Sequence, residues 1–185
     1  MTAILHTDKE AAYERKKEKY NKPGNVYLGM VHRLDRPVGG ILVFAKTSKA
    51  ASRLSEEIRN RKMIKKYIAL VHNKTKKYEK LIDKLDRNEK ANTTFVSENG
   101  KESILEYNLL EYRDNMSLID INLITGRHHQ IRVQLSHHGY PIYGDVKYGK
   151  DKNVQIHLWS YYLKFKHPTK DEYMEFIYYP DFKTR

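Results

Sequence analysis

Residues 31–46 read VHRLDRPVGGILVFAK and join a polar bend to an apolar run. The run from Gly40 to Phe44 is rich in branched side chains, which predicts a buried strand. Pro37 and the two adjacent glycines predict a bend before that strand rather than a helix. One carboxylate, Asp35, lies in the bend, so the segment predicts an acidic group at the mouth of a buried strand.

Basic residues surround this carboxylate, because His32, Arg33 and Arg36 flank Asp35. We expect these neighbours to lower the pKa of Asp35 and to keep it ionised at neutral pH. An ionised carboxylate suits a nucleophile or a general base better than a general acid. The alternative interpretation of the local pattern is a surface salt bridge, which contributes little to stability.

Three further segments complete a recognisable set. Residues 125–149 read TGRHHQIRVQLSHHGYPIYGDVKYG, residues 65–71 read KKYIALV, and residues 157–168 read HLWSYYLKFKHP. Together with the His-Arg-Leu-Asp of the first stretch, they resemble the motifs of RluA-type pseudouridine synthases, which isomerise uridine in structured RNA. The four motifs follow one another in the family's order over residues 27–168.

The resemblance implies roles for individual residues of this chain. It implies that Asp35 is the catalytic carboxylate, that the guanidinium of Arg132 pairs with it bidentately, and that Tyr67 contacts the target base. It also implies that Arg33 fills the gap left by the flipped uridine and that Ile131 packs against the flipped base. The residues expected to bind RNA or to support this set are His32, Arg36, Arg127, His128 and Gln130.

Other interpretations of the same residues stay open at this point. Arg132 also fits an ordinary helix-surface residue, and Tyr67 also fits a tyrosine of a core strand. Two pairs of adjacent histidines suggest a metal site, but neighbouring histidines on a helix point about 100° apart and do not chelate together. We therefore expect no metal. Paired carboxylates or a phosphate-cradling glycine loop, which a nuclease or phosphate-transfer enzyme would need, are not evident.

The composition favours a polyanionic partner. The chain has 185 residues, a formal net charge of +12 and 15 tyrosines. A basic chain usually meets nucleic acid, and aromatic residues among cations suit stacking on unpaired bases. We expect structured RNA, either rRNA or tRNA, as the partner. The absence of cysteine, of a long apolar run and of a signal peptide predicts a cytoplasmic protein without disulfides or a membrane partner.

The pattern of elements predicts an α+β fold with a mixed, mainly antiparallel sheet and a few packed helices around a central basic cleft. We expect one catalytic domain over residues 1–185, shortened at its N-terminus, with an exposed sheet edge and no RNA-binding module of the S4 type. The predicted helices cover residues 8–20, about 48–58 and 125–136. The predicted strands cover residues 26–31, 40–46, 66–72, 103–112 and 117–124, with a hairpin or excursion over 73–99 and two strands within 155–179.

Two functions remain as hypotheses from the sequence. The first is an RNA pseudouridine synthase, which needs no cofactor because the isomerisation neither adds nor removes an atom. The second is a catalytically silent RNA-binding remnant of such an enzyme. Salt-dependent binding of RNA is expected from both, and only the first predicts that Asp35→Asn abolishes product.

Overall fold

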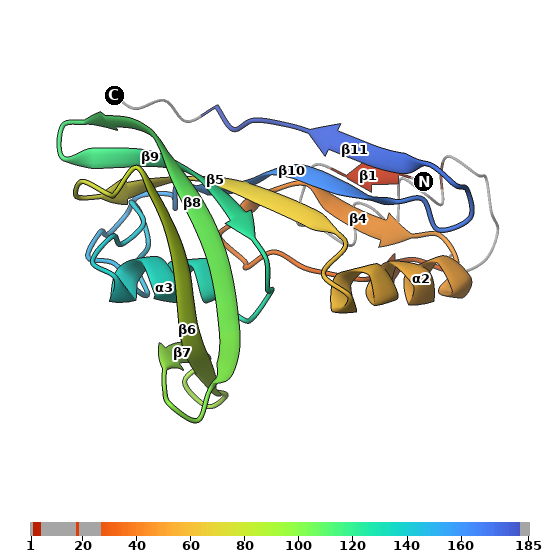
Figure 1. Ribbon diagram of the computed structural model, residues 1–185, viewed down its shortest axis with the longest axis horizontal. Coiled ribbons are helices and arrows are strands. Elements are labelled where there is room, and N and C mark those ends of the chain that lie inside the picture. The colour runs from red at the N-terminus through yellow and green to blue at the C-terminus, as the bar shows by residue number, and fades with distance from the viewer. Residues whose placement is uncertain (1, 5–17, 19–26, 182–185) are drawn as a thin grey trace.

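The computed structural model describes residues 2–4, 18 and 27–181 (Figure 1). Most strands pair with antiparallel neighbours. In chain order the elements are β1 (Thr2–Ile4), β2 (Gly29–Met30), β3 (Gly39–Gly40), β4 (Leu42–Ala45), α2 (Ser48–Arg59), β5 (Ile64–His72), β6 (Tyr78–Asn88), β7 (Thr93–Val96), β8 (Lys101–Arg113), β9 (Met116–Leu123), α3 (Gln130–His137), β10 (Leu158–Lys166) and β11 (Tyr173–Ile177).

The described strands form two sheets. The larger sheet has the order β11-β10-β5-β9-β8-β6-β7, and β3 pairs in parallel with β10 beside this path. The smaller sheet has the order β1-β4-β2, with both pairings antiparallel. The short strand β1 was not predicted. Strands β1 and β2 pair with the two sides of β4, so β4 is the central strand of the smaller sheet.

Both helices of the described residues lie on the same side of the larger sheet (Figure 1). Helix α2 begins after Thr47, whose hydroxyl accepts a hydrogen bond from the backbone N–H of Ala50 at 3.2 Å. This N-cap satisfies one of the backbone donors that a helix start leaves free. Helix α3 ends just before Gly139, whose φ of 85° turns the chain left-handed and stops the helix.

The buried side chains form two main clusters on this side of the sheet. The first gathers residues of β5, β8, β9 and α3, among them Ile119 and Leu135, which are fully buried. The second packs α2 against β4 and β10 through residues such as Leu54 and Phe165. Burying each side chain of this size contributes roughly 1.5–3 kcal/mol. The cleft described below is lined from both clusters, so their packing fixes its walls.

Most predicted elements are confirmed. The strands at 40–46, 66–72, 103–112 and 117–124 and the helix near 48–58 are present, and the polar segment 73–99 holds the hairpin of β6 and β7. Asp114 and Asn115 both have positive φ, which closes the predicted turn between β8 and β9. The fold is α+β, as predicted, with its sheet mainly antiparallel.

Three predictions differ from the structure or lie outside it. The helix predicted over 125–136 begins only at Gln130, because residues 125–129 form an irregular loop that is described below. The strand predicted over 26–31 is present as Gly29–Met30. The helix predicted over 8–20 lies outside the described residues apart from residue 18. No helix of the described part is long and apolar enough to cross a membrane.

Candidate active site

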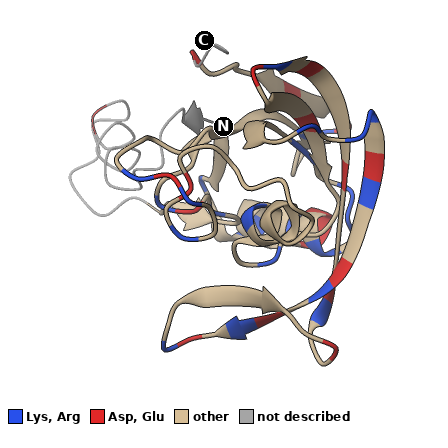
Figure 2. Cartoon of the chain, turned by 90° about the vertical axis from the view of Figure 1, so that its left-hand side faces the viewer, with Lys and Arg blue, Asp and Glu red and all other residues tan. Residues whose placement is uncertain are grey.

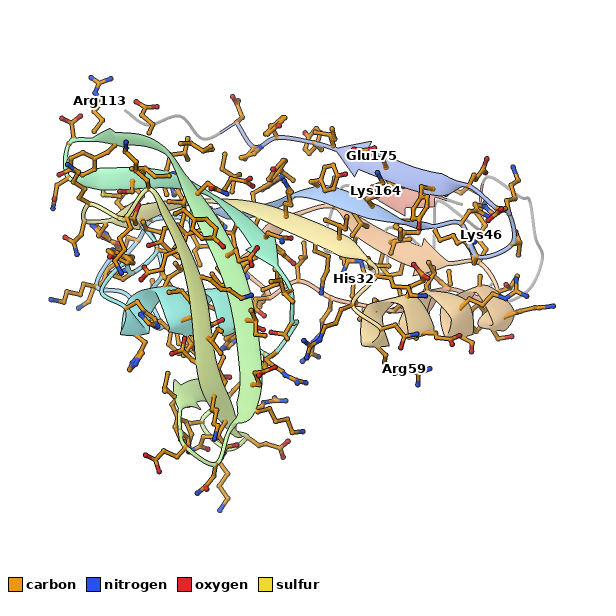
Figure 3. The ribbon with its side chains drawn as sticks, viewed as in Figure 1. His32, Lys46, Arg59, Arg113, Lys164 and Glu175 are labelled. Carbon is orange, nitrogen blue, oxygen red and sulfur yellow. The ribbon has the colours of Figure 1, made fainter. Side chains whose placement is uncertain are left out.

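A cleft of about 550 Å³ opens where the bend of residues 31–38, strand β5 and the loop before α3 meet. Figure 3 labels His32 and Arg59, two of its lining residues, close to the end of α2 that faces α3. Asp35 is the only acidic residue among the described residues that line it. The cations of its lining are Arg33, Arg59, Arg61, Lys65, Arg127 and Arg132. The predicted central basic cleft is therefore present.

The bend that carries Asp35 is held at several points. The backbone N–H of Val38 donates to the carbonyl of Asp35 at 2.9 Å, which closes a tight turn. The side-chain amide of Gln155 donates to the carbonyl of Pro37 at 2.6 Å. At the start of the bend, Nε2 of His32 accepts the backbone N–H of Val43 at 3.2 Å. Burial lowers the pKa of His32 to about 4, so the imidazole is neutral and free to accept.

The carboxylate of Asp35 meets Arg132 at one oxygen, with Nη1 of the arginine 3.4 Å from Oδ2. Nε2 of His129 lies 3.8 Å from the same oxygen. The predicted lowering of the pKa of Asp35 is wrong. Burial raises this pKa, and the charges of Arg132 and Arg33, which lower it, only partly offset the effect of burial. Desolvation wins because the bend places Asp35 inside the cleft and not at the surface.

The bidentate partner of Arg132 is Asp145, not Asp35 as the sequence predicted. Nε and Nη2 of the arginine donate to the two carboxylate oxygens of Asp145 at 2.8 and 2.7 Å. Both side chains are buried, with exposures of 4% and 0%. The pKa of Asp145 is lowered overall. Burial raises it, but Arg132 and the backbone N–H groups of Lys147 and Tyr148 lower it by more, so the carboxylate stays ionised. Arg132 is thus a buried residue and not a helix-surface residue.

The loop before α3 explains why this helix starts late. The amide oxygen of Gln130 accepts hydrogen bonds from the hydroxyl of Thr125 at 2.8 Å and from the backbone N–H of Arg127 at 3.0 Å. Its amide nitrogen donates to the carbonyl of Ile104 and to Gln134. Gln130, predicted to bind RNA or support the site, is 2% exposed and uses its amide inside the protein. It therefore shapes the loop that carries the arginine and histidines.

His129 is a site residue that the sequence interpretation missed. It has a left-handed φ of 51° and is 8% exposed. Tyr148 accepts the backbone N–H of Thr94 at 2.9 Å, and its hydroxyl lies 2.7 Å from Nδ1 of His129. Burial lowers the pKa of His129 to about 3, so the ring is neutral, Nδ1 accepts from the tyrosine, and Nε2–H faces Asp35. The spacing Gly-Arg-x-His of the motif was the available signal, since it selects His129 rather than His128.

Tyr67 lies on β5 inside the cleft, 7% exposed. Burial raises its pKa to about 12, and its hydroxyl is hydrogen-bonded to Ser160, so it is neutral near pH 7. The charge of Asp35 also acts on it, which shows that the phenol and the carboxylate are close. The structure therefore brings Asp35, Tyr67 and Arg132 into one cleft.

The other predicted residues divide between the cleft and its surroundings. His32, Arg33, Arg127, His128 and Ile131 all line the cleft, whereas Arg36 is exposed and does not. Arg33 and Arg127 are exposed at its rim, and Ile131 is buried. His128 stacks on His129 and bonds the hydroxyl of Thr94 at 2.9 Å, which ties the tip of the β6–β7 hairpin to the site.

The charges of the chain extend beyond this cleft (Figure 2). Lys and Arg are spread along the hairpin strands and around the helices, in places next to acidic residues. Within the described residues, no group of three or more His, Cys, Asp or Glu side chains is placed to hold a metal ion.

Comparisons with known proteins agree on one family. Residues 3–137 match the family model of RNA pseudouridylate synthase. The ribosomal large subunit pseudouridine synthase C of Buchnera aphidicola is 42% identical over 135 residues, which are 71% of this chain and 43% of that protein. An uncharacterized RNA pseudouridine synthase of Bacillus subtilis is 34% identical over 154 residues, 80% of this chain and 50% of that protein.

A solved structure extends the agreement to the fold. Human RNA pseudouridylate synthase domain containing 1 superposes with a TM-score of 0.78 at 27% identity, over 97% of this chain and 79% of that one. The chain spans about half the length of the curated relatives it matches. The family model covers most of the chain, including the bend of Asp35, strand β5 and helix α3. The chain belongs to the RNA pseudouridylate synthase family.

Proposed function

We propose that this chain converts a uridine of RNA to pseudouridine and that its substrate is RNA of the large ribosomal subunit. The Buchnera relative named above, a ribosomal large subunit pseudouridine synthase C, supports the choice of RNA, since it is 42% identical over 71% of this chain. The observation that carries the activity is a single half-buried carboxylate, Asp35, in a cleft otherwise lined, within the described residues, by cations and neutral groups. We further propose that the reaction takes place in the cytoplasm.

The conversion of uridine to pseudouridine requires few protein groups. The bond between C1′ of the ribose and N1 of the base breaks, a bond between C1′ and C5 forms, C5 loses a proton and N1 gains one. No atom is gained or lost overall, so the reaction requires neither cofactor nor metal. One positioned carboxylate is needed as nucleophile or base. Asp35 fits this role because Arg132 contacts only Oδ2, and no hydrogen bond from another described residue holds Oδ1.

The neighbours of Asp35 fit the handling of a flipped base. Tyr67 presents a neutral ring inside the cleft, and Ile131 adds an apolar wall beside it. Extracting a base from a stack costs a few kcal/mol, which stacking and an inserted planar cation partly offset. Arg33, exposed at the rim, is the residue we assign to that insertion. Arg127 and His128 are assigned to the phosphates around the target.

The test is direct. We expect the purified chain to release tritium from a large-subunit rRNA transcript labelled at C5 of its uridines, because pseudouridine formation removes the C5 proton. Asp35→Asn should abolish release while RNA affinity, measured by filter binding, stays within a factor of about two. Asp114→Asn, which removes an equal charge from an exposed turn, is the control and should release tritium like the wild type.

The second candidate, a silent RNA-binding remnant, gives a different pattern. It predicts RNA binding by the wild type with no tritium release, and no difference between the wild type and Asp35→Asn. Release by Asp35→Asn at the wild-type rate would instead show that another group performs the chemistry.

A further inference from the structure

Lys65 places a buried positive charge in the cleft that the described protein does not neutralise. Its side chain is 8% exposed and lines the cleft. Among the described residues its ammonium has no ion pair and no hydrogen bond. The only acid of the lining, Asp35, pairs with Arg132 instead. Burial lowers the pKa of Lys65, as expected for a cation without a compensating anion.

A comparison within the same cleft shows how unusual this is. Arg132 is also buried, but it is held by two carboxylates. Buried charges are normally paired, because removing them from water is costly. An unpaired buried ammonium is therefore best explained as a donor kept for a ligand atom.

The fold fixes where that atom would lie. Lys65 and Tyr67 are two residues apart on β5, so both point to the same face of the strand, about 6.6 Å apart along it. Nζ lies against the backbone of Gly126, where an added Cβ would approach it to 3.0 Å. The exposed cations Arg33 and Arg127 stand at the rim, where a phosphate backbone would run. A base that contacts Tyr67 would thus reach Lys65 with its edge.

We propose that Lys65 binds an exocyclic carbonyl oxygen of the flipped uracil. This proposal rests on the proposed function and names a substrate contact for it. Lys65 offers donors only, and uracil presents carbonyl oxygens at C2 and C4. Cytosine carries an amino group at C4, which cannot accept from an ammonium, so cytosine could offer this contact only through C2.

One ammonium at this position can contact a carbonyl oxygen of the base both before and after the isomerisation. Moving the ribose from N1 to C5 turns the ring by half a turn about the line through N3 and C6, which exchanges the two carbonyl groups. A lysine that holds a carbonyl oxygen before the turn meets the other carbonyl oxygen after it. When the C1′–N1 bond breaks, its electron pair stays on the base and spreads onto these oxygens. The ammonium therefore stabilises the charge that develops in the step.

The experiment compares Lys65→Met with Lys66→Met on the tritium-labelled large-subunit rRNA transcript. Lys66 is the neighbouring lysine on the other face of β5, where it pairs with Asp120 at 3.7 Å. For Lys65→Met we expect kcat to fall about 100-fold or more, the scale for loss of one donor to a developing oxyanion. We expect RNA affinity, its salt dependence and Lys66→Met activity to stay at wild-type values.

Thermal unfolding separates this role from a structural one. Lys65→Met removes an unpaired buried charge, so its Tm without RNA should equal or exceed that of the wild type. A kcat within about threefold of the wild type, or a lowered Tm, would overturn the proposal. A salt slope of RNA binding reduced by about 0.7–0.9, the value for one phosphate, would overturn it in favour of a backbone contact. Absence of release by the wild type itself would overturn the proposed function together with this contact.

Discussion

At the scale of single residues, Arg132 organises the site through two carboxylates in unlike surroundings. Asp145 takes two hydrogen bonds from the guanidinium and is fully buried, whereas Asp35 takes one longer contact. The pKa of Asp145 is lowered and that of Asp35 is raised. One arginine thus has a fully buried partner and a second partner that lines the cleft.

Asp145→Asn should be strongly destabilising. The neutral amide leaves Arg132 buried without its bidentate partner, and breaking a buried pair typically costs about 3–5 kcal/mol. We expect the free energy of unfolding, measured in urea, to fall by about 3 kcal/mol. Asp114→Asn, in an exposed turn, should change it by less than about 0.5 kcal/mol. Equal effects of the two variants would mean that the Arg132–Asp145 pair does not anchor the fold.

Asp35→Asn should change the stability of the fold in the opposite direction to Asp145→Asn. A carboxyl whose pKa is raised on folding stabilises the fold below its unfolded pKa, about 3.9, and loses that contribution as pH rises through the folded pKa. At pH 7 the ionised carboxylate therefore destabilises the fold, and we expect the Tm of Asp35→Asn to equal or exceed that of the wild type. Thermal unfolding from pH 7 down to pH 4 should show the difference shrinking. A variant that is less stable at pH 7 would contradict the direction of the shift.

At the scale of elements, the pairing of β3 with β10 fixes the position of the Asp35 bend. Gly40 has a φ of 129°, and a Cβ there would lie 2.3 Å from the carbonyl oxygen of Ser160. The backbone N–H of Ile41 then donates to that oxygen at 2.8 Å. A glycine is required because the strand must approach its neighbour more closely than a side chain allows.

Gly40→Ala should therefore destabilise the fold by at least about 2 kcal/mol, from strain at positive φ added to a backbone clash. Gly139→Ala is the matched control, because Gly139 also has a positive φ but nothing lies within 4 Å of the added Cβ. It should cost only about 1 kcal/mol, from strain at positive φ alone. Urea unfolding of both variants measures the difference. If the two lose the same stability, the close approach of β3 to β10 is not what Gly40 provides.

The strands and α2 could be predicted because local pattern and tertiary packing agree there. The alternation in β9 places every second residue in the core, and Thr47 is a good N-cap in front of an amphipathic helix. The start of α3 could not be predicted in this way. The helical pattern extends back to residue 125, but the side chain of Gln130 captures groups of Thr125 and Arg127 and holds them out of the helix.

The site shows a similar division. The motifs selected Asp35, Tyr67 and Arg132, and the structure gathers these residues in one cleft. The pKa direction of Asp35 could not be read from its basic neighbours, since burial depends on segments far away in the chain. The bidentate partner of Arg132 was also missed. Asp145 lies thirteen residues later in the chain, in a loop that comes next to α3 only through the tertiary fold.

At the scale of the whole molecule, the net charge of +12 comes from cations at different distances from the cleft, and we expect their contributions to RNA binding to differ. Cations such as Arg33 and Arg127 lie at the rim of the cleft, whereas others lie far from it. Figure 3 labels one of each kind, Arg59 beside the cleft and Arg113 at the turn between β8 and β9. Both are exposed, so replacing either one changes the net charge equally and leaves the core intact.

Arg59→Ala and Arg113→Ala therefore separate local contacts from overall charge. Each phosphate contact contributes about 0.7–0.9 to the slope of log affinity against log salt concentration. We expect Arg59→Ala to lower that slope by about this amount for large-subunit rRNA transcripts in filter binding, since Arg59 lines the cleft. Arg113→Ala should leave the slope unchanged and weaken binding only slightly at low salt. Equal losses in the two variants would mean that RNA responds to the net charge of the molecule rather than to the cleft.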